Sequence, residues 1–341
     1  MIDAWYYCNR QSKNEILQPR WFRPRSLWGL YVELEGMALP LRVTLRAVAG
    51  GQALLEQSFA LAKPDVKTKR LEAGFNPERG VLTLYAAARP LELLPEEIHV
   101  CVASEGREER AIIACNYARL YGTVTDFDGG PYPAAVMFYR HGFSNEFTMG
   151  VWTGLDGHYE AMVPKGTYNA FYVCDKGYKT SVLENWSWHM LADRDERHDF
   201  KIGTGEVYSL CVWPNNGGWS TLFCYFRPMV LGRNEKYTEQ INGRDFSVLD
   251  IAPELALEHV RVALNGLPLE CYSLQRIWET GRDGAMPGYV LQTRRTPDNR
   301  LPTGKQTLIV EYDAPVPGKG RATSQGRTQF YFQDAFGLAL R

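Results

Sequence analysis

The chain is 341 residues long, 45% of them hydrophobic and 23% charged, and its formal net charge at pH 7 is -1. This near-neutral balance gives no overall field that would attract nucleic-acid phosphates or anionic lipids, so we expect neither a nucleic acid nor a membrane as a partner. No basic segment followed by an apolar run opens the sequence, and no apolar stretch reaches the roughly 18 residues of a membrane span, so a cytoplasmic location is expected.

Aromatic residues make up 13% of the chain, which also holds 31 glycines and 19 prolines, a balance typical of many short strands joined by turns. The cysteines are odd in number, widely spaced and mostly set in apolar runs, so we interpret them as reduced and buried. They are Cys8, Cys101, Cys115, Cys174, Cys211, Cys224 and Cys271.

Residues 28–116 alternate apolar runs with turn residues at a spacing of roughly ten, which predicts about six short strands in a β-sandwich. The preceding segment, residues 19–28, mixes arginines with aromatic residues and prolines. Arginines packed over the edge of the domain are the favoured interpretation, and a ligand surface with cation–π contacts is the alternative.

Residues 117–203 contain the clearest turn signals. Apolar residues alternate before and after the turn DFDGG, and further hairpin signals occur at 156–157 (DG) and 165–166 (KG), each followed by a strand-like run. This pattern predicts a compact antiparallel module.

From residue 204 onward the pattern is again that of β-strands. Two hairpins are predicted, one around PNNGG at 214–218 and one around Asn265-Gly266. Residues 251–260 suggest a single helical turn, and 315–327 are expected to be a flexible loop between the last strands. The sequence therefore predicts an all-β protein of three tandem antiparallel β-sandwich domains, immunoglobulin-like or transthyretin-like, over residues 1–116, 117–203 and 204–341.

The turn and core residues of the second region follow a pattern shared with one family. They are Gly122, Val124, Asp126, Gly129, Pro131, Ala135, Val136, Thr153, Asp156, Gly157, Tyr159, Val163, Pro164, Gly166, Tyr168, Gly177 and Tyr178. These residues resemble the carboxypeptidase-regulatory-like module, and the resemblance implies a transthyretin-like sandwich, grouped with carbohydrate-binding-like folds, that is usually accessory to a catalytic neighbour. A zinc carboxypeptidase neighbour would need a glutamate three residues after a histidine, and none of the six histidines has one. We therefore expect no catalytic residue, metal or cofactor from this resemblance.

The segment ENWSWHM, residues 184–190, is the first candidate for a ligand site. Read as a strand, it places Glu184, Trp186 and Trp188 on one face together with Met190, and His189 on the other. Burying one tryptophan removes about 150 to 250 Å² from water, worth upward of ~4 kcal/mol, so burial in a core or domain seam is the favoured interpretation. The alternative is a flat platform on which a sugar ring stacks, with Glu184 as a hydrogen-bonded anchor or an acid.

A second aromatic pair, Trp213 and Trp219, flanks the PNNGG turn, where cross-strand packing is the favoured interpretation. Because this hairpin directly follows the second region, we expect both clusters near the junction of the second and third domains, where pockets often form. The predicted ligand-binding residues are Glu184, Trp186, Trp188, His189, Trp213 and Trp219.

Three functions stay open at this point. The favoured one is a non-enzymatic protein that binds a carbohydrate or a similar polar ligand at the aromatic junction. The alternatives are a glycan-acting hydrolase that uses Glu184 and Glu206, and a scaffold or assembly protein that holds a protein partner. Motifs for zinc, dithiol, nucleotide-loop or Gly-x-Ser-x-Gly chemistry are absent, although a serine triad on another pattern stays open. Acidic clusters at 126–128 and 193–199 suggest calcium, but neither supplies six to eight oxygen ligands, so turn residues are the default interpretation.

Overall fold

The computed structural model describes most of the chain. The described residues are 2–7, 10–11, 28–34, 37–63, 73–76, 80–86, 93–140, 148–215, 221–294, 303–318 and 320–332. Within these ranges the regular structure is β-strand apart from one turn of 3-10 helix, η1 (Leu257–His259), and most strand pairs are antiparallel. The prediction of an all-β, mainly antiparallel protein is confirmed, and so is the single helical turn expected within residues 251–260.

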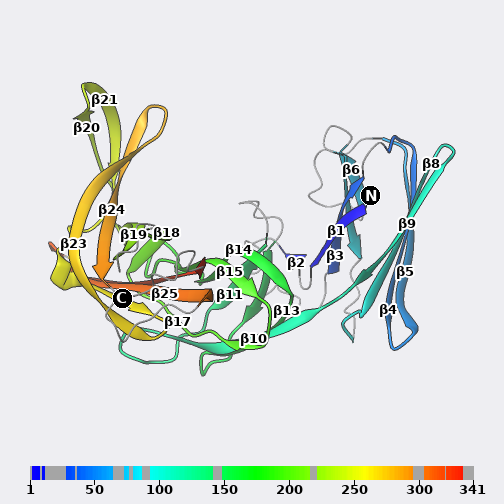
Figure 1. The fold of residues 1–341 in the computed structure, drawn as a ribbon, viewed down its shortest axis with the longest axis horizontal. Coiled ribbons are helices and arrows are strands. Elements are labelled where there is room, and N and C mark those ends of the chain that lie inside the picture. Colours follow the sequence, from blue (N-terminus) through cyan, green and yellow to red (C-terminus); the bar gives the residue numbers. More distant parts are fainter. Residues whose placement is uncertain are drawn as a thin grey trace.

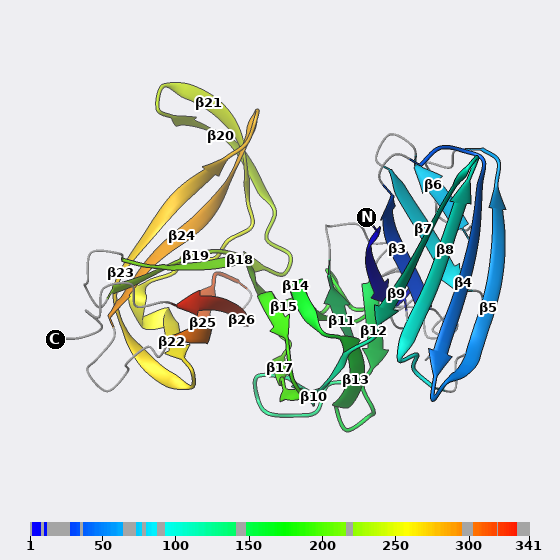
Figure 2. The same ribbon diagram turned by 45° about the vertical axis from the view of Figure 1, so that its right-hand side comes forward.

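Two four-stranded sheets form the N-terminal part (Figures 1 and 2). The first consists, in order, of β1 (Ile2–Tyr7), β3 (Trp28–Leu34), β7 (Val81–Ala86) and β6 (Ala73–Asn76). The second consists of β5 (Gln52–Leu61), β4 (Leu41–Ala49), β8 (Glu97–Ser104) and β9 (Arg107–Ala114). Alternate residues of β4 and β8 form one core with Leu82 of β7, so the two sheets face each other. The arginine-rich segment at 19–28 lies almost entirely outside the described residues.

The middle part also has two facing layers around one core. One layer consists of β13 (His158–Pro164), β10 (Tyr117–Thr125), β16 (Glu196–Arg197) and β17 (Phe200–Lys201). The other consists of β15 (Asn185–Ala192), β14 (Gly166–Cys174), β11 (Ala135–Tyr139) and β12 (Thr148–Trp152), with the short β2 (Arg10–Gln11) at its edge. Phe138, Phe171 and Phe200 belong to the core between them.

The second of these layers continues without a break into the C-terminal part. β15 pairs in parallel with β26, where Ser187 lies opposite Arg327, and the sheet that results has 14 strands. Beyond β15 its strands are β26 (Gly320–Phe332), β25 (Gly304–Val316), β22 (Val260–Leu264), β23 (Leu267–Thr280), β24 (Gly284–Arg294), β19 (Thr221–Val230) and β18 (Gly205–Pro214). The sheet curls back so that β18 packs against β26 and β15. The middle and C-terminal parts are therefore tied by backbone pairing, while the predicted boundaries at 116/117 and 203/204 stay predictions.

The structure of residues 315–327 differs from the loop predicted from the sequence. They were expected to form a flexible loop, but β25 runs to Val316 and β26 begins at Gly320. Gly326 lies so close to β18 that a side chain there would meet Val207 at 2.4 Å, and Ser324 is buried. Small and polar residues in this segment mark a strand packed closely against its neighbours rather than a loop.

A four-stranded arm projects from the C-terminal part (Figure 1). It combines the ends of β23 and β24 with the hairpin of β20 (Glu235–Ile241) and β21 (Arg244–Asp250), and β21 pairs in parallel with β24. This hairpin was not predicted from the sequence, although its turn, Asn242-Gly243, is a strong hairpin signal and both residues have positive φ.

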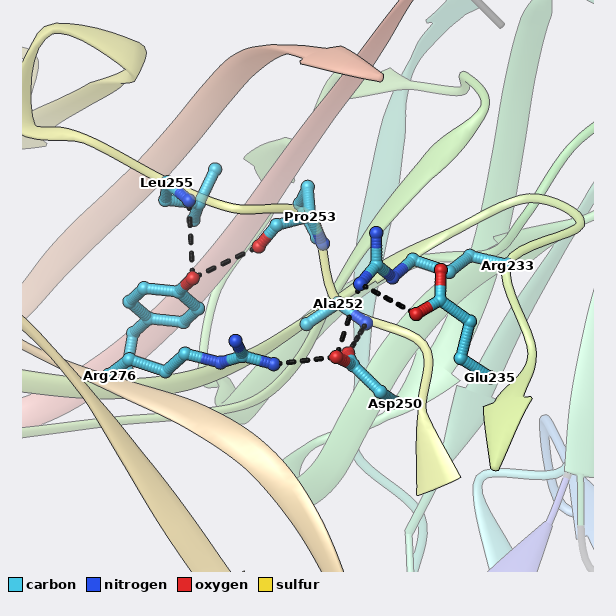
Figure 3. Close-up of polar contacts among 8 residues, drawn as sticks. Arg233, Glu235, Asp250, Ala252, Pro253, Leu255 and Arg276 are labelled. Atoms are coloured by element: carbon cyan, nitrogen blue, oxygen red, sulfur yellow. Dashed lines mark hydrogen bonds and ion pairs between the residues drawn. The ribbon is translucent and has the colours of Figure 1, made fainter. Parts of the chain in front are cut away.

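Asp250 holds the base of the arm (Figure 3). Its carboxylate is 2.7 Å from Arg276 of β23 and 3.1 Å from Arg233, and it accepts a hydrogen bond from the backbone N–H of Ala252. Burial would raise the pKa of Asp250, but hydrogen bonds from Arg276 and Arg233 outweigh burial and lower the pKa below its ordinary value. The ionised carboxylate therefore fixes β21 to β23.

Replacing Asp250 by asparagine should cost about 2 kcal/mol of unfolding free energy at pH 7, because Arg276 loses its counter-charge and Arg233 keeps only the exposed Glu235, at 3.4 Å. The folded-state pKa is depressed, so this stabilisation is present above the ordinary pKa of 3.8 and is lost as the pH falls through the lower folded-state value. Urea unfolding of both proteins at pH 7 and at pH 3 measures the difference, which should shrink at the lower pH. Asp283→Asn is the control, because the Asp283 side chain is 79% exposed at the tip of the arm. An equal loss in both variants, or a loss independent of pH, would contradict this assignment.

Candidate functional site

Five aromatic rings, Tyr139, Tyr172, Trp186, Trp188 and Tyr208, pack together where the middle and C-terminal parts meet; we call them the aromatic seam. Trp186 stacks between Tyr172, with ring centroids 4.4 Å apart, and Trp188, at 4.8 Å. Tyr139 stacks beside this pair, with its ring centroid 5.1 Å from that of Tyr172 and 6.3 Å from that of Trp186. Tyr208 from β18 stands edge-on against both tryptophans, at 5.4 and 4.9 Å. The seam therefore joins three strands of one layer to β18.

Strand register explains how these rings come together. Tyr172 lies directly opposite Trp186, whereas Trp188 and Tyr139 both lie opposite Ala170. The small side chain of Ala170 leaves space on the sheet face between these two rings. Trp188 can then stack on Trp186, and Tyr139 can contact both Tyr172 and Trp186.

The structure corrects the interpretation of Trp186 and Trp188 as a sugar platform. Each is only 6% exposed; Trp186 is stacked between Tyr172 and Trp188, and Trp188 has one face stacked on Trp186. The favoured interpretation, burial in a domain seam, is confirmed. Met190 was expected beside the tryptophans but belongs to the opposite core, because the strand changes faces at His189, whose φ is +54°. His189 itself is exposed, so its side chain is not buried in the seam.

Two carboxylates are buried at the seam. Glu184 is 4% and Glu206 2% exposed. Burial, followed by the negative charges of these two glutamates, raises the pKa of the neighbouring Tyr178 hydroxyl. Burial also raises the pKa of Tyr208, and both glutamates add to this effect while Arg227 opposes it. Both carboxylates of the pair chosen from the sequence for hydrolytic chemistry thus act on the same two tyrosine hydroxyls.

Trp213 lies at the other end of β18, on the same sheet face as Tyr208. In β19 the buried residues alternate with more exposed ones, and the exposed set pairs with Tyr208, Cys211 and Trp213 of β18. The β19 partners of Tyr208 and Trp213 are four residues apart, so these two side chains are separated by about 13 Å along the sheet. Trp213 is 43% exposed and stacks on Phe223, directly opposite it, with centroids 5.7 Å apart and planes 8° apart. Trp219 lies outside the described residues.

We call the open part of this face the outer strip; it comprises Cys211, Trp213, Phe223, Tyr225, Arg227, Gly288, Val290, Gln292, Gln275, Ile277 and Glu279. Tyr225 lies over Gly288, where a Cβ would meet its ring at 2.6 Å, and its hydroxyl hydrogen-bonds to Glu279. Arg227 donates to Glu279 at 2.8 and 2.9 Å, and its guanidinium lies 5.3 Å from the ring centroid of Tyr208. A network of charged and hydroxyl groups therefore connects the seam to the outer strip.

Most residues of the outer strip were not predicted from the sequence as site residues. The signal was present in LFCYFR, residues 222–227, where Phe223, Tyr225 and Arg227 alternate with the apolar residues at 222, 224 and 226. The partner residues come from β23 and β24, about 50 to 70 residues further along the chain, so the sequence alone did not show that they share a face with β19.

A buried serine–histidine pair lies on the other side of β15. Ser187 Oγ is 2.9 Å from His198 Nε2, and Arg327 is 2.7 Å from His198 Nδ1. A guanidinium only donates, so Nδ1 accepts and Nε2 carries the proton that is donated to Ser187. This direction is opposite to that of a general base acting on a nucleophilic serine. Burial and the charge of Arg327 lower the pKa of His198, and the pair is a structural contact.

The acidic clusters considered for calcium are engaged in structural contacts. Asp126 accepts hydrogen bonds from the backbone of Asp128 and Gly130, and Asp199 accepts one from Thr123. Asp193 pairs with Lys305 at 2.9 Å. In the part of the chain that the structure describes, no group of three or more metal-ligating side chains is placed to hold a metal ion.

Other features lie apart from the predicted site. The six described cysteines form no disulfide, and Cys211 is exposed, contrary to the expectation that they are buried. A surface hollow of about 350 Å³ on the middle part is lined by Tyr121, His158 and Arg197 among others, and contains none of the predicted site residues. No helix among the described residues has the length and apolar character needed to cross a membrane.

Comparison with known proteins gives weak structural likenesses only. No protein-family model matches the sequence, and no curated protein matches it. A DUF3823-family protein from Parabacteroides merdae is 11% identical over 63% of this chain and 99% of its own, with a TM-score of 0.21. The major pilin subunit of Bacillus cereus is 11% identical over 63% and 69%, with a TM-score of 0.19. A streptococcal ancillary pilin is 7% identical over 98% and 97%, also with 0.19. Identities and TM-scores at this level assign neither a shared overall fold nor a function.

Proposed function

We propose that the chain is a non-enzymatic β-sheet protein that binds a carbohydrate-like ligand on the outer strip, with the aromatic seam as its structural support. The observation that carries the proposal is the exposed stack of Trp213 on Phe223. An indole that is 43% exposed and held flat by a second ring presents a fixed apolar surface. This surface replaces the seam tryptophans as the expected stacking platform.

The chemistry of the outer strip matches a ligand with both apolar and hydroxyl faces. Amide groups of Gln292 and Gln275 lie in neighbouring rows of the sheet, and Glu279 supplies an acceptor at the far end of the strip. A sugar ring offers C–H groups to an aromatic face and hydroxyl groups to amides and carboxylates. Aromatic and hydrogen-bonding groups alternate on one open sheet face, which favours an extended polar chain over a compact apolar ligand.

Other expectations from the sequence remain proposals. The resemblance of residues 117–203 to the carboxypeptidase-regulatory-like module is supported by two layers around one core and by glycines at its turns, such as Gly157 with φ +75°. That module is usually accessory, which agrees with a binding role. A protein partner and a cytoplasmic location also stay predictions.

The proposal is tested by measuring the affinity of the full chain for a panel of oligosaccharides by isothermal titration calorimetry. Trp213→Ala and Phe223→Ala should each weaken binding about 5- to 150-fold, because a stacking surface worth about 1 to 3 kcal/mol is lost. Tyr331→Ala is the matched control, since Tyr331 is an aromatic residue 70% exposed on β26 and outside the strip. No binding by the unmodified chain, or equal affinity after Trp213→Ala, would contradict the proposal.

Glycan hydrolysis is the second candidate function. It is favoured by the burial of Glu184 and Glu206, both of which raise the pKa of Tyr178 and of Tyr208. Paired carboxylates are the minimum requirement for glycosidic cleavage. Incubation of the chain with the same oligosaccharides, followed by detection of new reducing ends, separates the two functions. We expect no cleavage. Cleavage that is abolished by both Glu184→Gln and Glu206→Gln would replace the binding function with a hydrolase.

A further inference from the structure

The outer edge of β23 is open. Residues 270–280 pair with β24 on one side, while β22 pairs only with residues 267–269 on the other. No strand in the described part of the chain pairs with this edge beyond Leu269. β23 accordingly lies along the outside of the arm in Figures 1 and 2.

Backbone groups of every second residue on this edge point away from β24. The hairpin closes with a hydrogen bond from Gly281 N–H to the Gly284 carbonyl, and antiparallel pairing alternates from there. Residues 279, 277 and 275 therefore bond to β24. Residues 280, 278, 276 and 274 direct their N–H and C=O groups outward, and such a row is a template for another strand.

This edge lacks proline and lysine, two residues that usually block strand addition, and its Glu279 is engaged by Arg227 at 2.8 Å. Residues 274–280 contain no proline, and the register shift in β23 lies between Cys271 and Ser273. Arg276 is engaged by Asp250 at 2.7 Å, and Ile277 at the centre is 37% exposed. The opposite edge of the arm, β20, carries Glu235, Lys236 and Glu239 in seven residues, the charge pattern of a protected edge.

We propose that β23 is a self-association edge, on which β23 of a second copy of this chain pairs antiparallel about a two-fold axis at Ile277. This register uses the whole regular segment from 274 to 280. It places Arg276 opposite Trp278 of the other copy, a cation–π pair, and Gln275 opposite Glu279. A two-fold axis one residue away, at Arg276, would place the two arginines directly opposite each other. The register centred on Ile277 is therefore favoured, because it uses the whole regular segment and does not place the two Arg276 side chains opposite each other.

A cross-linking experiment tests both the dimer and its register. Ile277 occupies a non-hydrogen-bonded position opposite itself, where Cα atoms are about 4.5 Å apart, within the range of a disulfide. Ile277→Cys in the full chain should form a covalent dimer under mild oxidation. Gln275→Cys is the matched control, because the register separates the two copies of residue 275 by four residues, about 13 Å. The unmodified chain gives the background from its native cysteines, including the exposed Cys211.

Sedimentation equilibrium of the unmodified chain should show a dimer. Thr280→Pro removes an outward N–H that β24 does not use, and Ile277→Lys places like charges at the two-fold axis. Each should weaken association at least tenfold, whereas Thr238→Lys on β20 should leave it unchanged, with circular dichroism confirming that all variants fold. A monomer at every concentration, equal cross-linking at residues 275 and 277, or loss of the dimer only with Thr238→Lys would overturn the proposal.

Discussion

Trp186→Ala should lower the free energy of unfolding by about 3 to 5 kcal/mol, the range for removing a buried tryptophan. Trp186 is at the centre of the aromatic seam and stacks on Tyr172 and Trp188, while the ring of Tyr208 packs perpendicular to it. Its indole N–H makes no hydrogen bond to any residue that the structure describes, so the loss arises from packing. Chemical unfolding followed by circular dichroism measures the change. Against a total stability of roughly 5 to 15 kcal/mol, this loss is large.

Trp213→Ala is the control for this experiment. Trp213 has the same side chain but is 43% exposed and contacts a single stacked ring, so its replacement should cost about 1 kcal/mol or less. Trp186→Phe keeps one ring in the stack and should fall between the two alanine variants. Similar losses at positions 186 and 213 would show that the seam does not support the junction between the two parts.

The local strand pattern was predictable from the sequence because hairpins are encoded by nearby residues. Asn265-Gly266 has positive φ at both positions, as its turn type requires; β22 ends just before this turn and β23 begins just after it. The pairing of β15 with β26 was not predictable. Ser187 and Arg327 are 140 residues apart, and parallel pairing leaves no turn signal between its strands. The continuous sheet is therefore a property of the tertiary structure.

The candidate site was also predicted only in part, because its residues come from strands that are distant in the sequence. Burial of Trp186 and Trp188 followed from the energy of removing an indole from water. Their partners could not be identified, because Tyr172 and Tyr208 arrive from other strands and because Ala170 makes the space that the stack needs. Exposure of Trp213 could not be read from the sequence either. It depends on which face of β18 the rest of the sheet covers.

Gly122→Ala should lower the free energy of unfolding by about 3 kcal/mol, the upper part of the range for overpacking. A Cβ on Gly122 would lie 2.4 Å from the backbone oxygen of His198 and 2.8 Å from its carbonyl carbon. This glycine is among the residues that resemble the regulatory-like module, and its role is close contact between backbones. β10 pairs with β16 before this point and with β17 after it, so the chain cannot move aside locally.

Displacement of His198 would also disturb the contacts that it anchors. Its carbonyl accepts a hydrogen bond from Tyr159 at 2.6 Å, and its ring lies between Ser187 and Arg327. Gly284→Ala is the matched control, because a Cβ there meets only an ordinary contact at 3.5 Å, and its stability should stay within about 0.5 kcal/mol of the unmodified chain. Thermal and urea unfolding of both variants measure the difference. If Gly122→Ala is as stable as Gly284→Ala, the contact between β10 and His198 is loose enough to accept a side chain, and the glycine is required for another reason.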